Sequence, residues 1–191
     1  MRPQQYNYII GAASLWLFIP VSVGLKLCDK LSCNKFTIII LLNTCTCMIV
    51  STIMWSNYDN KSIIYKLDLL FATIQFTLLN LVNIVNKNIN YIVQGLLSTL
   101  ILLFYFITNI FHKRQEWLFN IWSHLIFRYF GYLFCHLMLI SDCYNVLNIV
   151  ILTVIYYFHI LLSLTLLNIQ YEYHVYLVST VILLMVIFNI Y

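Results

Sequence analysis

The chain has 191 residues, of which 63% are hydrophobic and only 8% are charged, and its formal net charge is +4. Soluble domains carry about a quarter charged residues, and a chain of this length could not bury so much apolar surface in water. The composition therefore excludes a soluble globular protein and predicts one embedded in a lipid bilayer. The few basic residues are scattered and form no stripe of the kind that binds nucleic acid, so no nucleic-acid partner is expected.

A membrane-spanning helix needs about 20 mostly apolar residues. Seven stretches of the chain qualify, and they predict an all-α, polytopic transmembrane bundle of about seven spans. In chain order the expected spans are 8–25, 36–55, 63–85, 89–111, 117–140, 146–167 and 173–191. Pro20 interrupts the first span, where it is expected to kink the helix or end it early, because proline lacks a backbone N–H and crowds the preceding turn.

The connections between the spans are short, so residues 1–191 are expected to form a single transmembrane domain. The prediction is an integral, multi-pass membrane protein. Lysine and arginine are almost evenly divided between the two faces, so the positive-inside rule leaves the orientation open. The identity of the membrane and the oligomeric state are open as well.

The fifth span is unusual because it carries Arg128 near its middle, with His124 one turn earlier. Ionisable groups at that depth are costly, so they usually face the interior of a bundle and have partners there. Helix rise places Ser51 and Asp68 about one turn inside the face where the N-terminus lies, with His124 about two turns in and Arg128 about three. We therefore expect Ser51, Asp68, His124 and Arg128 to form a polar site.

Two interpretations of this polar site stay open. In the structural one, Asp68 neutralises Arg128, or each side chain extends towards its nearer interface. In the functional one, the site holds a proton, a lipid headgroup or a metal, for which Asp68 and His124 are the candidate ligands. A Ser–His–Asp nucleophilic site is formally available, but neither the order nor the spacing of Ser51, His124 and Asp68 supports it. No catalytic residue is assigned, and no cofactor is expected from the spacing alone.

Two other groups of residues favour packing roles. His159, beside Tyr156 and Tyr157, is expected to hydrogen-bond a neighbouring helix. The cysteines inside apolar runs form no paired CxxC signature and are expected to behave as small apolar residues. They are Cys45, Cys47 and Cys135.

Three stretches together resemble the CREST superfamily of seven-helix membrane proteins, which includes alkaline ceramidases and progestin/adipoQ-type receptors. They are STIMW at 51–55, LD at 67–68 and NIWSHLIFRY at 120–129. The pattern of that superfamily is Ser-x3-His on the second span, Asp on the third, and His-x3-His on a late span. The resemblance implies a zinc-dependent amide hydrolase acting on lipids.

Ser51, Asp68 and His124 match that pattern residue by residue. Trp55 and Asn120 stand where the pattern has two further histidines, and the late motif lies on the fifth expected span rather than the last. A catalytic zinc normally has three protein ligands. The resemblance therefore implies a degenerate member that has lost zinc and hydrolysis.

Three functions follow as hypotheses. The first, favoured because the chain lacks a recognisable catalytic set, is a non-enzymatic membrane protein with a structural, assembly or scaffold role. The second is a degenerate CREST-like membrane hydrolase acting on lipid amides. The third is a small transporter or ion pathway built on Asp68, His124, Arg128 and His159. The expected partners are the bilayer and, at the polar site, a lipid ligand.

Overall fold

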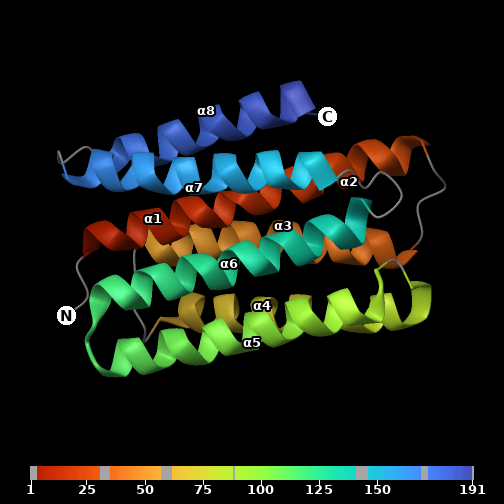
Figure 1. Ribbon diagram of the computed structural model, residues 1–191, viewed down its shortest axis with the longest axis horizontal. Helices are drawn as coiled ribbons and strands as arrows, with labels where there is room; N and C mark the ends of the chain where they lie inside the picture. Colours follow the sequence, from red (N-terminus) through yellow and green to blue (C-terminus); the bar gives the residue numbers. More distant parts are fainter. Residues whose placement is uncertain are drawn as a thin grey trace.

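The computed structural model describes residues 4–30, 35–56, 62–87, 89–140, 146–168 and 172–190, and within them it contains helices and no strand. Helices α1, η1 and α2 follow one another without a gap, so the described chain forms seven helical rods, with consecutive rods running in opposite directions (Figure 1). The elements are α1 (Gln4–Ser14), η1 (Leu15–Leu17), α2 (Phe18–Lys30), α3 (Lys35–Ser56), α4 (Ile63–Asn86), α5 (Tyr91–Lys113), α6 (Trp117–Ile140), α7 (Val146–Asn168) and α8 (Glu172–Ile190). The predicted all-α class is confirmed, and the last six rods begin and end within about two residues of the expected spans.

Pro20 disturbs the first rod but does not end it. The ring of a proline crowds the carbonyl four residues earlier, which here belongs to Trp16, and supplies no N–H to it. At that point the chain tightens into the 3₁₀ turn η1, and the N–H of Phe18 bonds to the carbonyl of Leu15. The rod then continues to Lys30 as α2. The early end is not observed, and the change at this point is the 3₁₀ turn.

Short polar side chains mark the ends of α4 and α5. Ser62 and Asn90 are the N-caps of these helices, and each side chain accepts a backbone N–H of the first turn. Such caps satisfy donors that have no partner within the helix. Lys87 ends α4 in the left-handed conformation, with φ of 56°, and its N–H bonds to the carbonyl of Asn83 at 2.8 Å.

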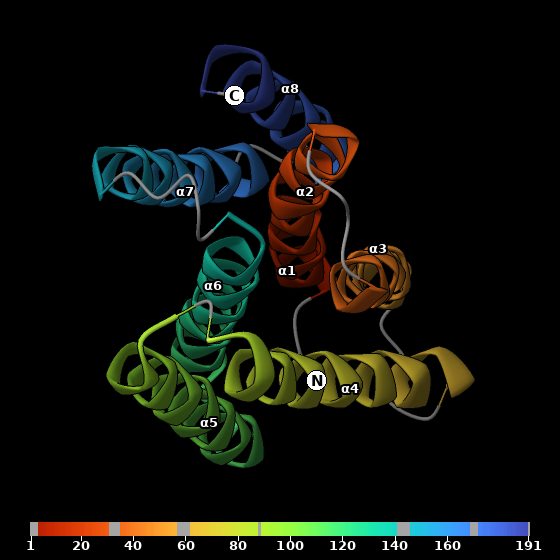
Figure 2. The ribbon, with the colours of Figure 1, turned by 90° about the vertical axis from the view of Figure 1, so that its right-hand side faces the viewer.

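Helix α6 lies inside the bundle. It contacts α1, α2, α4 and α5, and Figure 2 shows it with α4 and α5 on one side and α7 and α8 on the other. From Asn120 to Leu139, no residue of α6 is exposed. Helices α4 and α5, in contrast, expose large apolar side chains along most of their lengths. The helix that carries Arg128 is therefore enclosed by its neighbours, as the first rod is from residue 7 to residue 24 apart from Phe18.

Four helical segments of the described chain are long and apolar enough to cross a membrane. They are Asn7–Leu25, Lys35–Ser56, Ile63–Asn86 and Tyr91–Lys113. Two shorter apolar helices lie within α7 and α8, namely Ile149–Thr165 and His174–Phe188. In lipid an α-helix satisfies its own backbone groups, and the outward surface of these helices is mainly Leu, Ile, Val and Phe. This surface suits contact with hydrocarbon.

Candidate functional site

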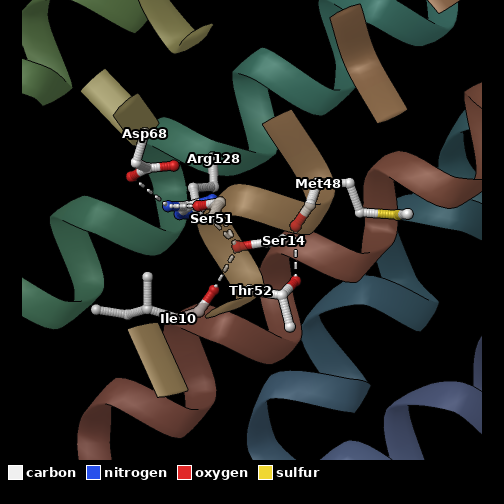
Figure 3. Close-up of polar contacts among 7 residues, drawn as sticks. All are labelled: Ile10, Ser14, Met48, Ser51, Thr52, Asp68 and Arg128. Atoms are coloured by element: carbon white, nitrogen blue, oxygen red, sulfur yellow. Dashed lines mark hydrogen bonds and ion pairs between the residues drawn. The ribbon is translucent and has the colours of Figure 1, made fainter. Parts of the chain in front are cut away.

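The centre of the candidate site is the guanidinium of Arg128, which reaches from α6 to three other helices (Figure 3). Its Nη1 donates a hydrogen bond to Oγ of Ser14 on α1 at 2.7 Å, and its Nη2 donates to Oγ of Ser51 on α3 at 2.6 Å. Oδ2 of Asp68 on α4 lies 4.0 Å from Nη2. One side chain therefore links four helices.

The two serines provide neutral acceptors for a group that can only donate. A guanidinium has five N–H groups and no lone pair to offer, so each N–H needs an oxygen opposite it. The hydroxyl of Ser14 donates to the carbonyl of Ile10 at 3.0 Å, and its oxygen lies 3.3 Å from that of Ser51. The lone pairs of both hydroxyls can face Arg128, while the compensating charge comes from Asp68.

Aromatic rings form one wall of the site. The indole of Trp55 lies with its ring centroid 5.8 Å from Cζ of Arg128, within the range of a cation–π contact. The ring of His124 packs edge-on against the same indole, with centroids 4.8 Å apart, and also against Phe127. His124 thus contacts the wall of the site.

Of the four predicted residues, the structure brings Ser51, Asp68 and Arg128 together and places His124 against Trp55. Ser14 was not among the expected residues. A serine is tolerated at many positions of an apolar helix, so its chemistry gives little signal. The sequence offered only the depth of Ser14, which lies roughly 9 Å into the expected span 8–25 by helix rise.

The residues present do not fit a zinc centre of the kind that the resemblance implies. Within the described ranges, no three side chains of His, Cys, Asp or Glu are grouped to hold a metal ion. Trp55 stands where the superfamily pattern has its first histidine, and its indole covers Arg128. Asn120 stands where the pattern has a second histidine, and its amide donates to the carbonyl of Thr108 on α5 at 2.8 Å. Asp68 and His124 alone fall short of the three ligands that a catalytic zinc needs.

Comparison with known proteins does not place the chain in a family. No family model matches it, and neither does any curated protein or solved structure.

A second polar cluster lies two turns further along α4, around Gln75. Nε2 of Gln75 donates to Oγ1 of Thr44 at 2.7 Å and contacts Sγ of Cys135 at 3.3 Å. Its Oε1 accepts from Nδ2 of Asn43 at 2.5 Å. The cluster joins α3, α4 and α6, and Cys135 takes part as a free thiol. The sequence shows these residues as polar but does not show their pairing.

His159 forms a third polar contact, on the opposite side of the bundle. Nε1 of Trp16 donates to Nδ1 of His159 at 3.1 Å, and Nε2 of His159 lies 2.6 Å from Oγ of Ser179. An indole N–H can only donate, so Nδ1 must accept and the ring proton must sit on Nε2. The hydroxyl of Ser179 in turn donates a hydrogen bond to the carbonyl of Val175 at 2.6 Å. The expectation that His159 bonds a neighbouring helix is confirmed, and the contact fixes one neutral tautomer.

Amides and hydroxyls also join α4, α5 and α6 in pairs. The hydrogen bonds between α4 and α5 lie on the side of the turn that connects these two helices. The hydrogen bonds between α5 and α6 lie near the C-terminal end of α5. The hydrogen-bonded residues are Asn80, Asn83, Gln94, Ser98, Thr108, Asn120 and Ser123. These contacts hold successive helices in register without any charge.

Proposed function

We propose that the chain is an integral, multi-pass membrane protein that acts without catalysis, as a structural or assembly component of its membrane. The apolar outer surface of the bundle supports an environment of lipid. The polar interior supports a role in holding a defined arrangement of helices, since hydrogen bonds between helices in membranes typically contribute about 1 kcal/mol each.

The observation that carries this proposal is that the polar side chains of the interior bond to one another across helices. Arg128 bonds to Ser14 and Ser51 and lies beside Asp68, which ties α6 to three neighbours. His159 in the same way ties α7 to η1 and α8. Side chains engaged in this way act as cross-links between helices.

The surroundings of Ser51 speak against nucleophilic catalysis. A serine nucleophile needs an adjacent base that takes its proton. The hydroxyl of Ser51 instead accepts from Arg128, and a guanidinium cannot take up a proton. The neighbouring hydroxyl of Ser14 is no stronger a base. This arrangement supports a binding or packing role for Ser51 over a hydrolytic one.

The contacts of His159 give little support to a proton pathway. To carry a proton, the ring would have to bind one at Nδ1, and that atom accepts from the indole of Trp16. In a protonated ring, the N–H at Nδ1 of His159 would point at the indole N–H of Trp16, and two donors would face each other. A pathway through His159 would therefore require the η1 contact to break first.

Two measurements test the proposal. Alkaline carbonate should leave the protein in the membrane fraction, because the bundle exposes apolar side chains along its lipid-facing helices; extraction would remove the proposal. Purified protein should turn over neither lipid amides nor lipid esters, and its zinc content should be the same in the wild type and in His124→Ala. Turnover that disappears in Ser51→Ala, or one equivalent of zinc that disappears in His124→Ala, would replace the proposal with the hydrolase hypothesis.

A further inference from the structure

Helix α5 lies at the edge of the bundle, and one side of it is exposed along the whole length of the helix. It packs against α6 and α4, which lie on the other side of it (Figure 2). On the outward side, residues spaced alternately three and four apart form an unbroken exposed line. We call this line the α5 seam, and its members are Ile92, Gly95, Thr99, Leu102, Phe106 and Asn109.

The composition of the α5 seam differs from that of the exposed residues beside it. Those neighbours are large and apolar, whereas the seam has a glycine, a threonine and an asparagine among its six positions. A Cβ added at Gly95 would meet nothing within 4 Å, so this point of the helix surface is open. Contact with lipid alone requires neither small nor polar residues, and all three lie on one line. The flanking residues are Tyr91, Val93, Leu96, Leu103, Tyr105 and Ile110.

The two polar side chains of the α5 seam have hydrogen-bonding groups that the described chain does not use. On the outward side of α4, Thr73 and Thr77 donate to the carbonyls four residues earlier. Neither Thr99 nor Asn109 has a hydrogen bond from its side chain to any described residue. By helix rise, Thr99 lies roughly 12 Å from the start of α5 and Asn109 roughly 6 Å from its end. Polar groups left without a partner in lipid are costly.

We propose that the α5 seam is the contact between two copies of this chain, which pair side by side as a two-fold dimer with parallel α5 helices. This inference rests on the proposed membrane location. Two copies inserted in the same direction bring each residue of α5 to the depth of its own counterpart, and a two-fold axis places the same surface on both sides. The amide of Asn109 carries donors and an acceptor, so it can bond to the amide of the second copy. The hydroxyls of Thr99 complement each other in the same way.

The spacing of the α5 seam suits a long contact between two helices. Steps of three and four average 3.5 residues, the repeat that keeps two helices together when they cross at about 20° with a left-handed twist. Gly95 lets the two backbones approach closely, and a single asparagine in such a line fixes register and the number of helices. Lys113 stands at the next position of the repeat. It ends α5, so its long side chain can extend to the headgroups and away from a second lysine.

The apolar surface around the α5 seam is large enough for a stable dimer. Six large side chains on or beside the line are exposed by 45% to 80%. At roughly 200 Å² for a large side chain, they offer about 650 Å² per copy and about 1,300 Å² for the pair. A specific interface needs about 1,000 Å² or more. The six are Tyr91, Ile92, Leu102, Leu103, Phe106 and Ile110.

Energy transfer between copies of the full-length protein tests the dimer. Donor-labelled and acceptor-labelled protein is reconstituted together in phosphatidylcholine vesicles over a range of lipid-to-protein ratios. We expect transfer that falls as lipid is added and that unlabelled protein suppresses as it does for a dimer. Asn109→Leu keeps the surface apolar but removes the amide, so it should weaken association roughly tenfold. Gly95→Leu holds the two backbones apart and should weaken association tenfold or more.

Ala72→Leu is the matched control for Gly95→Leu, because it enlarges an exposed small residue on α4. It should leave energy transfer unchanged. In dilute micelles, where the copies are separate, Gly95→Leu should keep the circular dichroism of the wild type, since nothing in the described chain lies within 4 Å of that point. If Gly95→Leu does not fold, Asn109→Leu decides the outcome.

Cross-linking tests which side of α5 faces the second copy. Under mild oxidation in the same vesicles, Thr99→Cys should form a covalent dimer well above the wild-type background. Val93→Cys is also exposed but lies about 120° around the helix from Thr99, so it should stay at that background.

The absence of concentration-dependent transfer in the wild type would show that lipid alone covers the α5 seam and would overturn the dimer. Equal loss of transfer in Ala72→Leu, or equal cross-linking through Val93→Cys, would overturn it as well. Any of these results in a protein that resists carbonate extraction leaves the proposed function intact. Extraction by carbonate would remove the proposed function itself, so the two failures are distinguishable.

Discussion

Replacing Arg128 with leucine should destabilise the bundle unless Asp68 is neutralised in the same molecule. Leucine is better suited to hydrocarbon than arginine, so a residue-by-residue view of lipid partitioning predicts the opposite. In the structure, however, Arg128→Leu removes two hydrogen bonds to serines and leaves the carboxylate of Asp68 beside an apolar side chain. The sign of the effect therefore distinguishes a paired arginine from one that only interrupts an apolar helix.

The expected magnitudes follow from the geometry. Removing one member of a buried ion pair costs about 3–5 kcal/mol, and the 4.0 Å separation and residual exposure of this pair place Arg128→Leu near 3 kcal/mol. Asp68→Asn should cost about 1 kcal/mol, because the guanidinium loses a counter-charge 4.0 Å away but keeps both serine acceptors. The double variant should cost about 2 kcal/mol, since two serine contacts are lost but no charge is left alone. The two substitutions are thus expected to interact by about 2 kcal/mol.

The free energies of unfolding can be measured in mixed micelles by titration with sodium dodecyl sulfate, followed by far-ultraviolet circular dichroism. Lys113→Leu is a matched control, because it removes one positive charge from an exposed position at the end of α5. It should change the unfolding free energy by less than about 0.5 kcal/mol. Additive effects of the Arg128 and Asp68 substitutions, or an Arg128→Leu variant as stable as the wild type, would refute the pairing.

Four further substitutions, one of them a control, are tested by the same unfolding assay. His159→Phe keeps a ring but leaves the buried indole N–H unpaired, so it should cost about 1–3 kcal/mol; no loss would show that this contact does not hold the helices. Gly11→Ala places a methyl against the hydroxyl of Tyr176 and should destabilise the bundle by about 1–3 kcal/mol. Gly95→Ala is the control: its methyl meets open space, so it should be neutral or stabilise the bundle by up to about 1 kcal/mol. Lys87→Gly relieves a left-handed residue and should stabilise by about 1 kcal/mol; destabilisation would mean that the lysine side chain contributes more than its backbone costs.

The sequence predicts the rods well because each lies in an apolar run of about the length that a membrane-spanning helix needs. The first rod shows where that rule loses information. It was expected to end at residue 25, but α2 continues to Lys30, because the polar residues after the apolar run can still adopt helical geometry. Apolarity marks the part of a helix that suits lipid, whereas hydrogen bonding decides where the helix ends.

The approach of Asp68 to Arg128 could be predicted because opposite charges inside apolar helices seek each other, and long side chains can bridge a difference in depth of about two turns. The position of His124 could not. Its four-residue spacing from Arg128 places both on one side of α6, but the spacing does not reveal that Trp55 packs against its ring. The partners of Gln75 were equally hidden, because an amide gives no sign of charge and its neighbours depend on which helices are adjacent.

The polar contacts inside the bundle differ in how closely their partners approach. On the side of α7 and α8, the ring of His159 meets a donor on one nitrogen and an acceptor on the other. On the side of α4, Oδ2 of Asp68 lies 4.0 Å from Nη2 of Arg128, which is beyond hydrogen-bonding distance. The ion pair of Arg128 and Asp68 is therefore looser than the hydrogen bonds of His159, and its expected contribution lies at the lower end of the range for buried pairs.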